Sequence, residues 1–296
     1  MHASEQFGIK SERGECKLNQ IREWKKVLIP YEQAVEELKI KFKSIRKQYR
    51  DVSEYSDIEF VTGRVKKISS ILEKSKRRNI PEDKIEELME DIAGIRIMCQ
   101  FRDDIYKVVE HIRERDGKDL RIVYEKDYIS NPKGSGYKSY HVIIQYPVHT
   151  ALGEQSVLAE IQIRTLAMNF WATIEHSLNY KYKDNIPENV KLRLRKSAEA
   201  ASNLDEEMCE IRNEIINAQL MFEEKSNIVF DITNNIQLLH IAGQQDQAYT
   251  FQERFDQIWD TSSIDDLSQL LSDIKAVMPR YQIFSLDAEN ENEELV

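Results

Sequence analysis

Two long stretches of the chain place apolar residues three and four positions apart in alternation, which is the pattern of one face of an α-helix. The first predicts a helix over residues 21–49, interrupted or started near Pro30 because proline has no backbone N–H group to donate. Its apolar positions are Ile21, Trp24, Leu28, Tyr31, Val35, Leu38, Phe42, Ile45 and Tyr49. The apolar positions of the second helix are Leu194, Ala201, Leu204, Met208, Ile211, Ile215 and Phe222. Both apolar faces suit packing in a protein core, and an oligomer interface is the more specific alternative.

Between these stretches the spacing of apolar residues becomes that of β-strands. Residues 92–101 form a nearly continuous apolar run, typical of a buried strand, and residues 120–129 alternate between apolar and polar. Residues 139–146 and 157–164 predict two more strands, joined by a hairpin loop at 150–155. These four segments predict a mixed β-sheet, which we expect to have about five strands in all.

Helices are expected between and after these strands. Asp103 and Asp104 can cap one helix, whose inward positions are Ile105, Val108, Val109 and Ile112. Another helix begins at Leu166, with the inward positions Phe170, Ile174 and Leu178. A mixed sheet flanked by helices, with helical N- and C-terminal extensions, makes the predicted fold class α+β.

The last quarter of the chain differs from the rest in its charge. Residues 223–296 contain 15 acidic and 4 basic residues, so they account for the formal net charge of −10 and the remainder is nearly neutral. One helix is expected around 251–259 and another over 264–277, and the last ten residues are expected to be frayed. We divide the chain into an N-terminal extension (1–20), a main domain (21–222) and an acidic, helical C-terminal extension.

The composition of the chain indicates the cellular compartment in which the protein is expected. No apolar run approaches the roughly 20 residues that cross a bilayer, and the charged N-terminus lacks the apolar stretch of a secretory signal. We therefore expect a cytoplasmic protein without a membrane partner. Cys16, Cys99 and Cys209 are odd in number, widely separated and without metal-ligand spacing, which favours free thiols.

A basic block lies within the nearly neutral part of the chain. Residues 39–78 hold 13 Lys and Arg against 5 Asp and Glu. A solvated helix face, a site for nucleotide phosphates and an RNA-binding surface are all compatible with this composition. Within the block, Ser70, Lys74 and Arg77 share one face of a predicted helix, which is the arrangement of donors that a triphosphate needs.

Two strands of the predicted sheet carry acidic and basic side chains. Asp91 stands at the mouth of the 92–101 strand, and Arg96 lies inside it, where a guanidinium group requires a carboxylate or a ligand. On the 157–164 strand, Glu160, Gln162 and Arg164 alternate with apolar residues and project from one face. A solvent-facing polar row is one interpretation. Carboxylates on two adjacent strands are also the arrangement that holds Mg²⁺ against a polyphosphate.

The glycine-containing loop at 131–139 does not have the spacing of a Walker A loop or of a dinucleotide fingerprint. It presents Lys133 and Tyr137, with His141 nearby, and an aromatic plane beside donors suits a purine base and its phosphates. No histidine of the chain is followed by aspartate, so the His-Asp metal pair of nucleotide phosphohydrolases is missing and a hydrolase is disfavoured.

Taken together, these motifs resemble the synthetase domain of RelA/SpoT-type proteins in its small, stand-alone form. The resemblance runs from about Trp24 to Ala218. It rests on GRVK at 63–66, DIAGIR at 91–96, GYKSYH at 136–141, EIQIRT at 160–165, and MNFWA with EHSL over 168–178.

The resemblance implies transfer of the β,γ-pyrophosphate of ATP to the ribose 3′-hydroxyl of GTP or GDP, making (p)ppGpp and AMP. It implies that Asp91 binds Mg²⁺ and that Glu160 is a metal contact or general base. The adenine would be held by Arg64 and Arg96, and the ATP phosphates by Lys66, Ser70, Lys74 and Arg77. Tyr137 would stack on guanine, and the acceptor would be arranged by Lys133, His141, Gln162 and Asn169.

Small synthetases often assemble as tetramers through terminal helices, and some bind the pentaphosphate product at an activating site. The residues that match that allosteric site are Lys39, Lys43, Phe60 and Thr62. The chain departs from the family's short form at both ends. We expect the C-terminal extension to modulate the enzyme without serving its chemistry, because every motif precedes it; packing on the 194–222 helix and binding of a partner are alternatives.

Two rival functions remain open at the level of sequence. A nucleotidyltransferase shares the implied fold, but such enzymes usually carry an Asp-x-Asp pair where Asp91 stands alone. A catalytically inactive nucleotide- or RNA-binding module would explain the basic block, but it has no need for both Asp91 and Glu160.

Overall fold

The computed structural model describes residues 4–151, 153–182, 186–259 and 263–277. These divide into two compact units, residues 1–209 and 210–296. The expected frayed C-terminus lies outside the described residues, as do the side chains before Glu23, including Cys16. Within the described part of the chain, no helix has both the length and the apolar character that a bilayer crossing requires.

The first unit is built on a five-stranded mixed sheet, which confirms the predicted fold class. The strands are β1 (Phe60–Val65), β2 (Ala93–Cys99), β3 (Arg121–Asp127), β4 (Tyr140–Thr150) and β5 (Gly153–Thr165). Their order in the sheet is β1-β2-β5-β4-β3, and only the pair β2 and β5 is parallel. β4 and β5 form a hairpin that is longer than predicted, since Thr150 pairs with Gly153.

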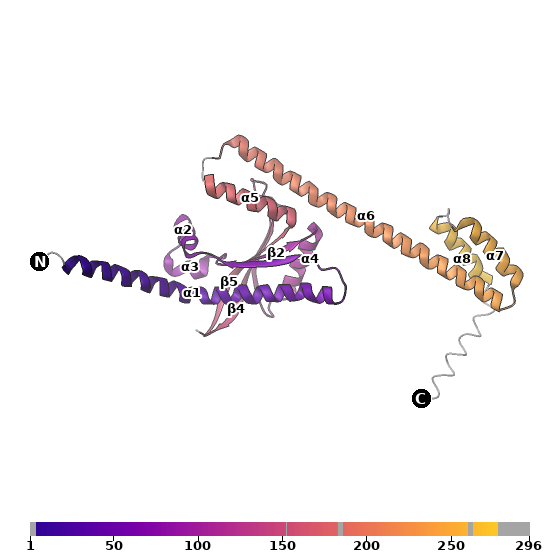
Figure 1. Cartoon of the computed structure of the whole chain (residues 1–296), viewed down its shortest axis with the longest axis horizontal. Coiled ribbons are helices and arrows are strands. Elements are labelled where there is room, and N and C mark those ends of the chain that lie inside the picture. Colours follow the sequence, from indigo (N-terminus) through magenta and orange to yellow (C-terminus); the bar gives the residue numbers. More distant parts are fainter. Residues whose placement is uncertain (1–3, 152, 183–185, 260–262, 278–296) are drawn as a thin grey trace, which may run out of the picture. The chain divides into compact units, whose positions relative to one another are not determined.

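One long helix, α1 (Ser4–Asp51), packs along one face of the sheet (Figure 1). The expected interruption at Pro30 is wrong, because the helix continues through this residue. Pro30 removes one helical hydrogen bond, but the turns on either side are anchored in the core by Leu28, Tyr31 and Val35, which are buried against the sheet. Tertiary packing therefore outweighs the local preference.

Shorter helices complete this layer. They are α2 (Ile68–Arg78), the 3₁₀ turn η1 (Glu82–Lys84), α3 (Ile85–Leu88) and α4 (Arg102–Arg113). The N-cap residue is Phe101 and not one of the two aspartates, which lie in the first turn of the helix. The carboxylate of Asp104 accepts a hydrogen bond from the backbone N–H of Phe101, which is the return bond of a capping box. The four predicted inward residues of α4 are buried in the same core as α1.

The helix α5 (Leu166–Tyr182) lies on the other side of the sheet (Figure 1). The predicted inward face of this helix is wrong, since Phe170 is 69% exposed and Ile174 is 42% exposed. The buried residues are Met168, Trp171 and Ala172, and the indole N–H of Trp171 donates to the backbone oxygen of Leu194 at 3.0 Å. Both sets have helical spacing, so periodicity alone could not choose between them.

The helix α6 (Glu188–Ile241) spans the boundary between the two units. In the second unit its C-terminal turns pack against α7 (Gln245–Ile258) and α8 (Ile264–Val277). The bounds of α7 and α8 are close to those predicted for the two helices of the extension. The core of this unit contains Ile232, Ile236, Leu239, Ala248, Phe251, Leu267, Leu270, Leu271 and Ile274. The extension therefore has a hydrophobic core of its own.

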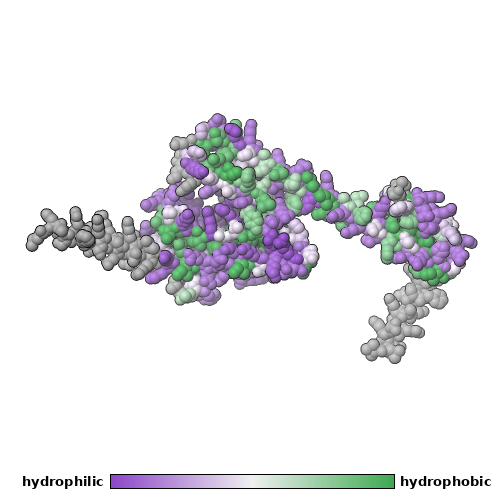
Figure 2. Space-filling model, viewed as in Figure 1, coloured by the Kyte–Doolittle hydropathy of each residue, from purple (hydrophilic) through white to green (hydrophobic). Residues whose placement is uncertain are grey.

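The predicted apolar stripe of α6 is largely uncovered before this core. Leu204, Met208, Ile211, Ile215 and Phe222 are all exposed, with Phe222 75% exposed, and Figure 2 shows apolar side chains along this helix. Exposed apolar stripes of this spacing are typical of helix–helix interfaces.

Substitution of Gly63 should loosen the contact between α1 and β1. A Cβ atom at Gly63 would lie 2.8 Å from Cγ1 of Val35 and 2.9 Å from Cδ1 of Ile95. We predict that Gly63→Ala lowers the free energy of unfolding by about 1–3 kcal/mol, as overpacking usually does. Denaturant unfolding measures this, with Gly134→Ala as the control because a Cβ there meets nothing within 4 Å. Equal stability of the two variants would contradict the close approach.

Removal of the extension should leave the first unit folded. A chain that ends at Phe222 loses only residues outside the main core, so we predict that it stays soluble with an unchanged melting temperature for the first unit. A chain that ends at Ile241 keeps Ile232, Ile236 and Leu239 but loses α7 and α8, which cover them, so it should aggregate more readily. An insoluble shorter chain would show that the extension belongs to the main domain.

Candidate functional site

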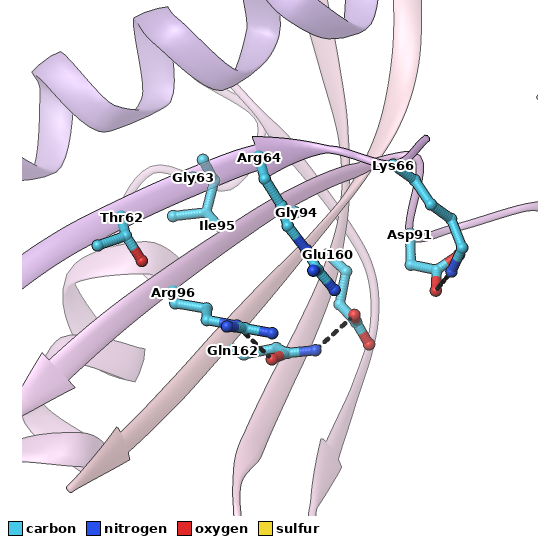
Figure 3. A pocket seen from close by; sticks show the side chains of 10 residues that line it. All are labelled: Thr62, Gly63, Arg64, Lys66, Asp91, Gly94, Ile95, Arg96, Glu160 and Gln162. Carbon is cyan, nitrogen blue, oxygen red and sulfur yellow. Dashed lines mark hydrogen bonds and ion pairs between the residues drawn. The ribbon is translucent and has the colours of Figure 1, made fainter. Parts of the chain in front are cut away.

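A polar pocket lies on the face of the sheet opposite α1 (Figure 3). Its empty space, counted together with the open solvent at its mouth, is about 570 Å³. β1, β2 and β5 supply its walls. The lining residues are Thr62, Gly63, Arg64, Lys66, Asp91, Gly94, Ile95, Arg96, Glu160 and Gln162.

Strand register brings the two predicted acidic residues to one end of this pocket. β2 and β5 run in parallel with Gly94 opposite Glu160 and Arg96 opposite Gln162. Asp91 lies just before β2, at the same end as Glu160, and both residues line the pocket. The strand that follows Asp91 and the strand that carries Glu160 are therefore neighbours in the sheet, as expected.

Asp91 is held between two lysines. Its Oδ2 atom accepts a hydrogen bond from Nζ of Lys66 at 2.7 Å. The same oxygen lies 2.7 Å from Nζ of Lys74. Burial raises the pKa of Asp91, but the hydrogen bonds from both lysines outweigh burial and hold the pKa below its usual value. Asp91 is therefore ionised at neutral pH, with both lysines turned toward it.

Glu160 is held from the other side of the pocket. Its Oε1 atom lies 2.9 Å from Nδ1 of His141, and its Oε2 atom accepts from Nε2 of Gln162 at 2.8 Å. Burial raises the pKa of Glu160, but the hydrogen bonds from His141 and Gln162 outweigh burial, so the net shift is downward. Glu160 is thus an ionised carboxylate that faces the pocket.

Two arginines line the rest of the pocket. Arg64 projects from β1 and Arg96 from β2 (Figure 3). Burial lowers the pKa of Arg96, and the charges of Arg164 and Arg64 lower it further. Crowded guanidinium groups of this kind favour an anion or an aromatic plane between them.

The predicted purine loop closes on the same site. The hydroxyl of Tyr137 lies 2.8 Å from Nε2 of His141, and Nζ of Lys133 lies 4.7 Å from the centre of the Tyr137 ring. Burial raises the pKa of Tyr137 and lowers that of Lys133. Gly136 has φ of 89° and lies against Ala198 of α6, where a Cβ would approach to 2.7 Å, so only glycine fits this turn.

The two carboxylates of the pocket suit Mg²⁺ only if a bound substrate supplies further oxygen ligands to the ion. The Oδ1 atom of Asp91 is buried without a hydrogen-bond partner among the described residues, which leaves it free to meet a cation. Within the same described residues, no group of three or more His, Cys, Asp or Glu side chains could hold a metal ion alone. Mg²⁺ is commonly bound by one or two carboxylates together with substrate phosphates, and Asp91 with Glu160 fits that pattern.

Comparison with known proteins decides the family. A family model described as a region found in RelA/SpoT proteins matches residues 63–185. The GTP pyrophosphokinase YjbM of Bacillus subtilis is 60% identical over 204 residues, which cover 69% of this chain and 95% of YjbM. The chain belongs to the RelA/SpoT family.

Solved structures of this RelA/SpoT group have the same fold. The small alarmone synthetase 1 of Bacillus subtilis bound to its product pppGpp is 60% identical, with a TM-score of 0.63 over 66% of this chain and 98% of that chain. The same protein bound to AMPCPP gives a TM-score of 0.57 at 57% identity, over 66% of this chain and 98% of that chain. Both leave about a third of this chain unmatched.

Some of the residues predicted from the family motifs lie away from the pocket. Ser70 and Arg77 are on α2, as is Lys74, and Asn169 is half-buried on α5. Lys74 pairs with Asp91, but no described hydrogen bond or ion pair joins Ser70, Arg77 or Asn169 to the residues that line the pocket. The four allosteric candidates divide between two elements. Lys39 and Lys43 are on α1, where Lys39 pairs with Glu36 at 2.8 Å. Phe60 and Thr62 are on β1, and Thr62 lines the pocket on the face of the sheet opposite α1.

One residue of the RelA/SpoT motifs has a larger part in the site than the sequence indicated. Arg164 is only 5% exposed, and its side chain donates to Ser139, Tyr137 and Gln162. The signal was its place on the same strand face as Glu160 and Gln162. The pairing of β4 with β5 was expected from the predicted hairpin, but the sequence did not give its register, which brings Ser139 to Arg164.

Proposed function

We propose that this protein is a GTP pyrophosphokinase, which transfers the β,γ-pyrophosphate of ATP to the 3′-hydroxyl of GTP or GDP and releases AMP. The observation that carries the proposal is the joint position of Asp91, Glu160, Lys66 and Lys74 at one end of the pocket. The relatives support it, because YjbM is a GTP pyrophosphokinase and crystal structures of the small alarmone synthetase 1 of Bacillus subtilis contain pppGpp or AMPCPP.

The basic residues would hold the ATP. Lys66 and Lys74, with Ser70 and Arg77 on the same helix, bind the phosphates, and their charges offset the negative charge that grows on the leaving oxygen. Arg64 and Arg96 hold the adenine between their guanidinium planes. When the phosphates of ATP bind, Lys66 and Lys74 must give up their ion pairs with Asp91 and pair with phosphate oxygens instead.

The acidic residues would handle the metal ion and the proton. Asp91, with Glu160, would hold Mg²⁺ together with the phosphates, and the ion would supply charge neutralisation and alignment of the transferred group. Glu160 accepts the proton of the attacking 3′-hydroxyl, which is possible because it is ionised before the reaction.

The loop side of the pocket would hold the acceptor nucleotide. Tyr137 stacks on guanine, and the acceptor is arranged by Lys133, His141, Gln162 and Asn169. This places guanosine on the His141 side of Glu160 and ATP on the Asp91 side, so that the attacking hydroxyl lies between the two nucleotides.

The finer assignments are also proposals. We propose that the enzyme acts in the cytoplasm as a homotetramer, with the exposed stripe of α6 at an interface, and that (p)ppGpp binds at an allosteric site formed by Lys39, Lys43, Phe60 and Thr62. The acidic extension modulates activity, and RNA is a further candidate ligand of the basic block.

The proposed function is tested by incubating the protein with ATP labelled at the γ-phosphate, GTP and Mg²⁺. Label in guanosine pentaphosphate supports pyrophosphate transfer. Label released as pyrophosphate indicates a nucleotidyltransferase, and absence of turnover indicates a binding module.

Loss of either acidic group should abolish synthesis. We predict that Asp91→Asn and Glu160→Gln each lower kcat at least about a hundredfold, because each removes a charge that handles metal or proton at nearly constant volume. Steady-state rates measure this, and Glu154→Gln is the matched control, since it makes the same change at an exposed position of the same strand. Near-normal turnover of Asp91→Asn or Glu160→Gln would refute the assignment.

Loss of the stacking ring should weaken the guanosine substrate selectively. We predict that Tyr137→Ala raises KM for GTP more than KM for ATP, because stacking acts on the acceptor base. Tyr249→Ala, at an exposed tyrosine of α7, serves as the control. A shift confined to KM for ATP would mean that the two nucleotides occupy each other's places.

A further inference from the structure

Arg164 is a buried cation whose partners are all uncharged. It lies on β5, and its guanidinium group donates to the hydroxyls of Ser139 and Tyr137 and to the side-chain oxygen of Gln162. Among the described residues, no carboxylate lies within ion-pair distance of Arg164. Burial of an unpaired guanidinium group is costly, so its retention here calls for a role beyond packing.

The hydrogen bonds that leave Arg164 form two chains that both end on Glu160. An ionised carboxylate only accepts hydrogen bonds, so Nδ1 of His141 donates to Oε1 of Glu160 and Nε2 of His141 accepts from the Tyr137 hydroxyl. The oxygen of that hydroxyl accepts from Arg164. This first chain therefore runs from Arg164 through Tyr137 and His141 to one oxygen of Glu160.

The second chain is shorter. The guanidinium group of Arg164 donates to Oε1 of Gln162 at 2.8 Å, and Nε2 of Gln162 donates to Oε2 of Glu160 at 2.8 Å. Each bond polarises the next, because the donors in both chains point the same way. The two chains close a ring in which both oxygens of Glu160 are fixed by donors that Arg164 orients, and Nε of Arg96 also donates to Oε1 of Gln162 at 3.4 Å.

We propose that Arg164 is a positioning residue for pyrophosphate transfer, which fixes the Glu160 carboxylate through Tyr137–His141 and through Gln162. The inference rests on the proposed function, in which Glu160 accepts the proton of the attacking hydroxyl. It adds a second task for Tyr137: the ring face contacts guanine, while the hydroxyl transmits the orientation from Arg164 to His141.

The chain contains a matched triad away from the pocket. Arg113 donates to Glu125 and, at 3.2 Å, to the hydroxyl of Tyr140, and that hydroxyl donates to Glu125. None of these three residues lines the pocket. Changes in this triad therefore remove similar bonds from the same unit without reaching Glu160.

The test is a double-mutant cycle with separate kcat and KM values. The variants are Tyr137→Phe, Arg164→Gln, their combination, and Arg164→Lys, with Tyr140→Phe and Arg113→Gln as controls. We expect Tyr137→Phe and Arg164→Gln each to lower kcat about 10- to 100-fold, as loss of an orienting partner typically does, with KM for ATP unchanged. Arg164→Lys, which keeps a charged donor, should recover part of the loss.

The combination decides between positioning and independent structural roles. If Arg164 acts through the Tyr137 hydroxyl, the double variant loses less than the product of the two single losses. Multiplied losses would overturn the inference, as would equal kcat losses in the Arg113 and Tyr140 controls. If Arg164→Gln does not fold, Tyr137→Phe still decides: unchanged kcat in this variant overturns the inference. A wild-type protein that makes no labelled guanosine product refutes the proposed function itself, and the inference with it.

Discussion

The parallel pairing of β2 with β5 is the constraint on which the site depends. Its register sets Gly94 opposite Glu160 and Arg96 opposite Gln162, and it brings Asp91 to the end of the sheet where Glu160 lies. Because side chains alternate along a strand, a shift of one residue would turn Glu160 and Gln162 into the apolar core and bring Ile161 into the pocket. The buried residues Ile95, Ile161 and Ile163 on the α1 side oppose such a shift, so the core enforces the geometry of the site.

Charge is distributed across this pocket in an order that suits its proposed chemistry. Asp91 pairs with both Lys66 and Lys74, and the ring of hydrogen bonds from Arg164 fixes Glu160. In the proposed function, the carboxylate of Asp91 occupies the place that a phosphate would take between the two lysines. Binding of a nucleotide would then exchange one anion for another, so that neither partly buried lysine is left unpaired.

The sequence predicted the elements whose signal is local. The strand β2 is a continuous apolar run, and α8 has a clear helical period, so both were expected near their observed bounds. The continuation of α1 through Pro30 and the outward position of Phe170 were not predictable, because both depend on how distant parts of the chain pack. The motifs gave most of the site residues, but the role of Arg164 depends on the register of β4 against β5, which a single sequence does not contain.

The central claim is that Asp91 and the two lysines form one site shared by phosphate and metal ion. Calorimetric binding of AMPCPP to the wild-type protein and to Asp91→Asn, each with and without Mg²⁺, tests it most directly. The account predicts that Asp91→Asn binds metal-free AMPCPP more tightly than the wild type, because Lys66 and Lys74 are released, and that Mg²⁺ no longer strengthens binding. Weaker metal-free binding by Asp91→Asn, with the Mg²⁺ effect retained, would contradict it.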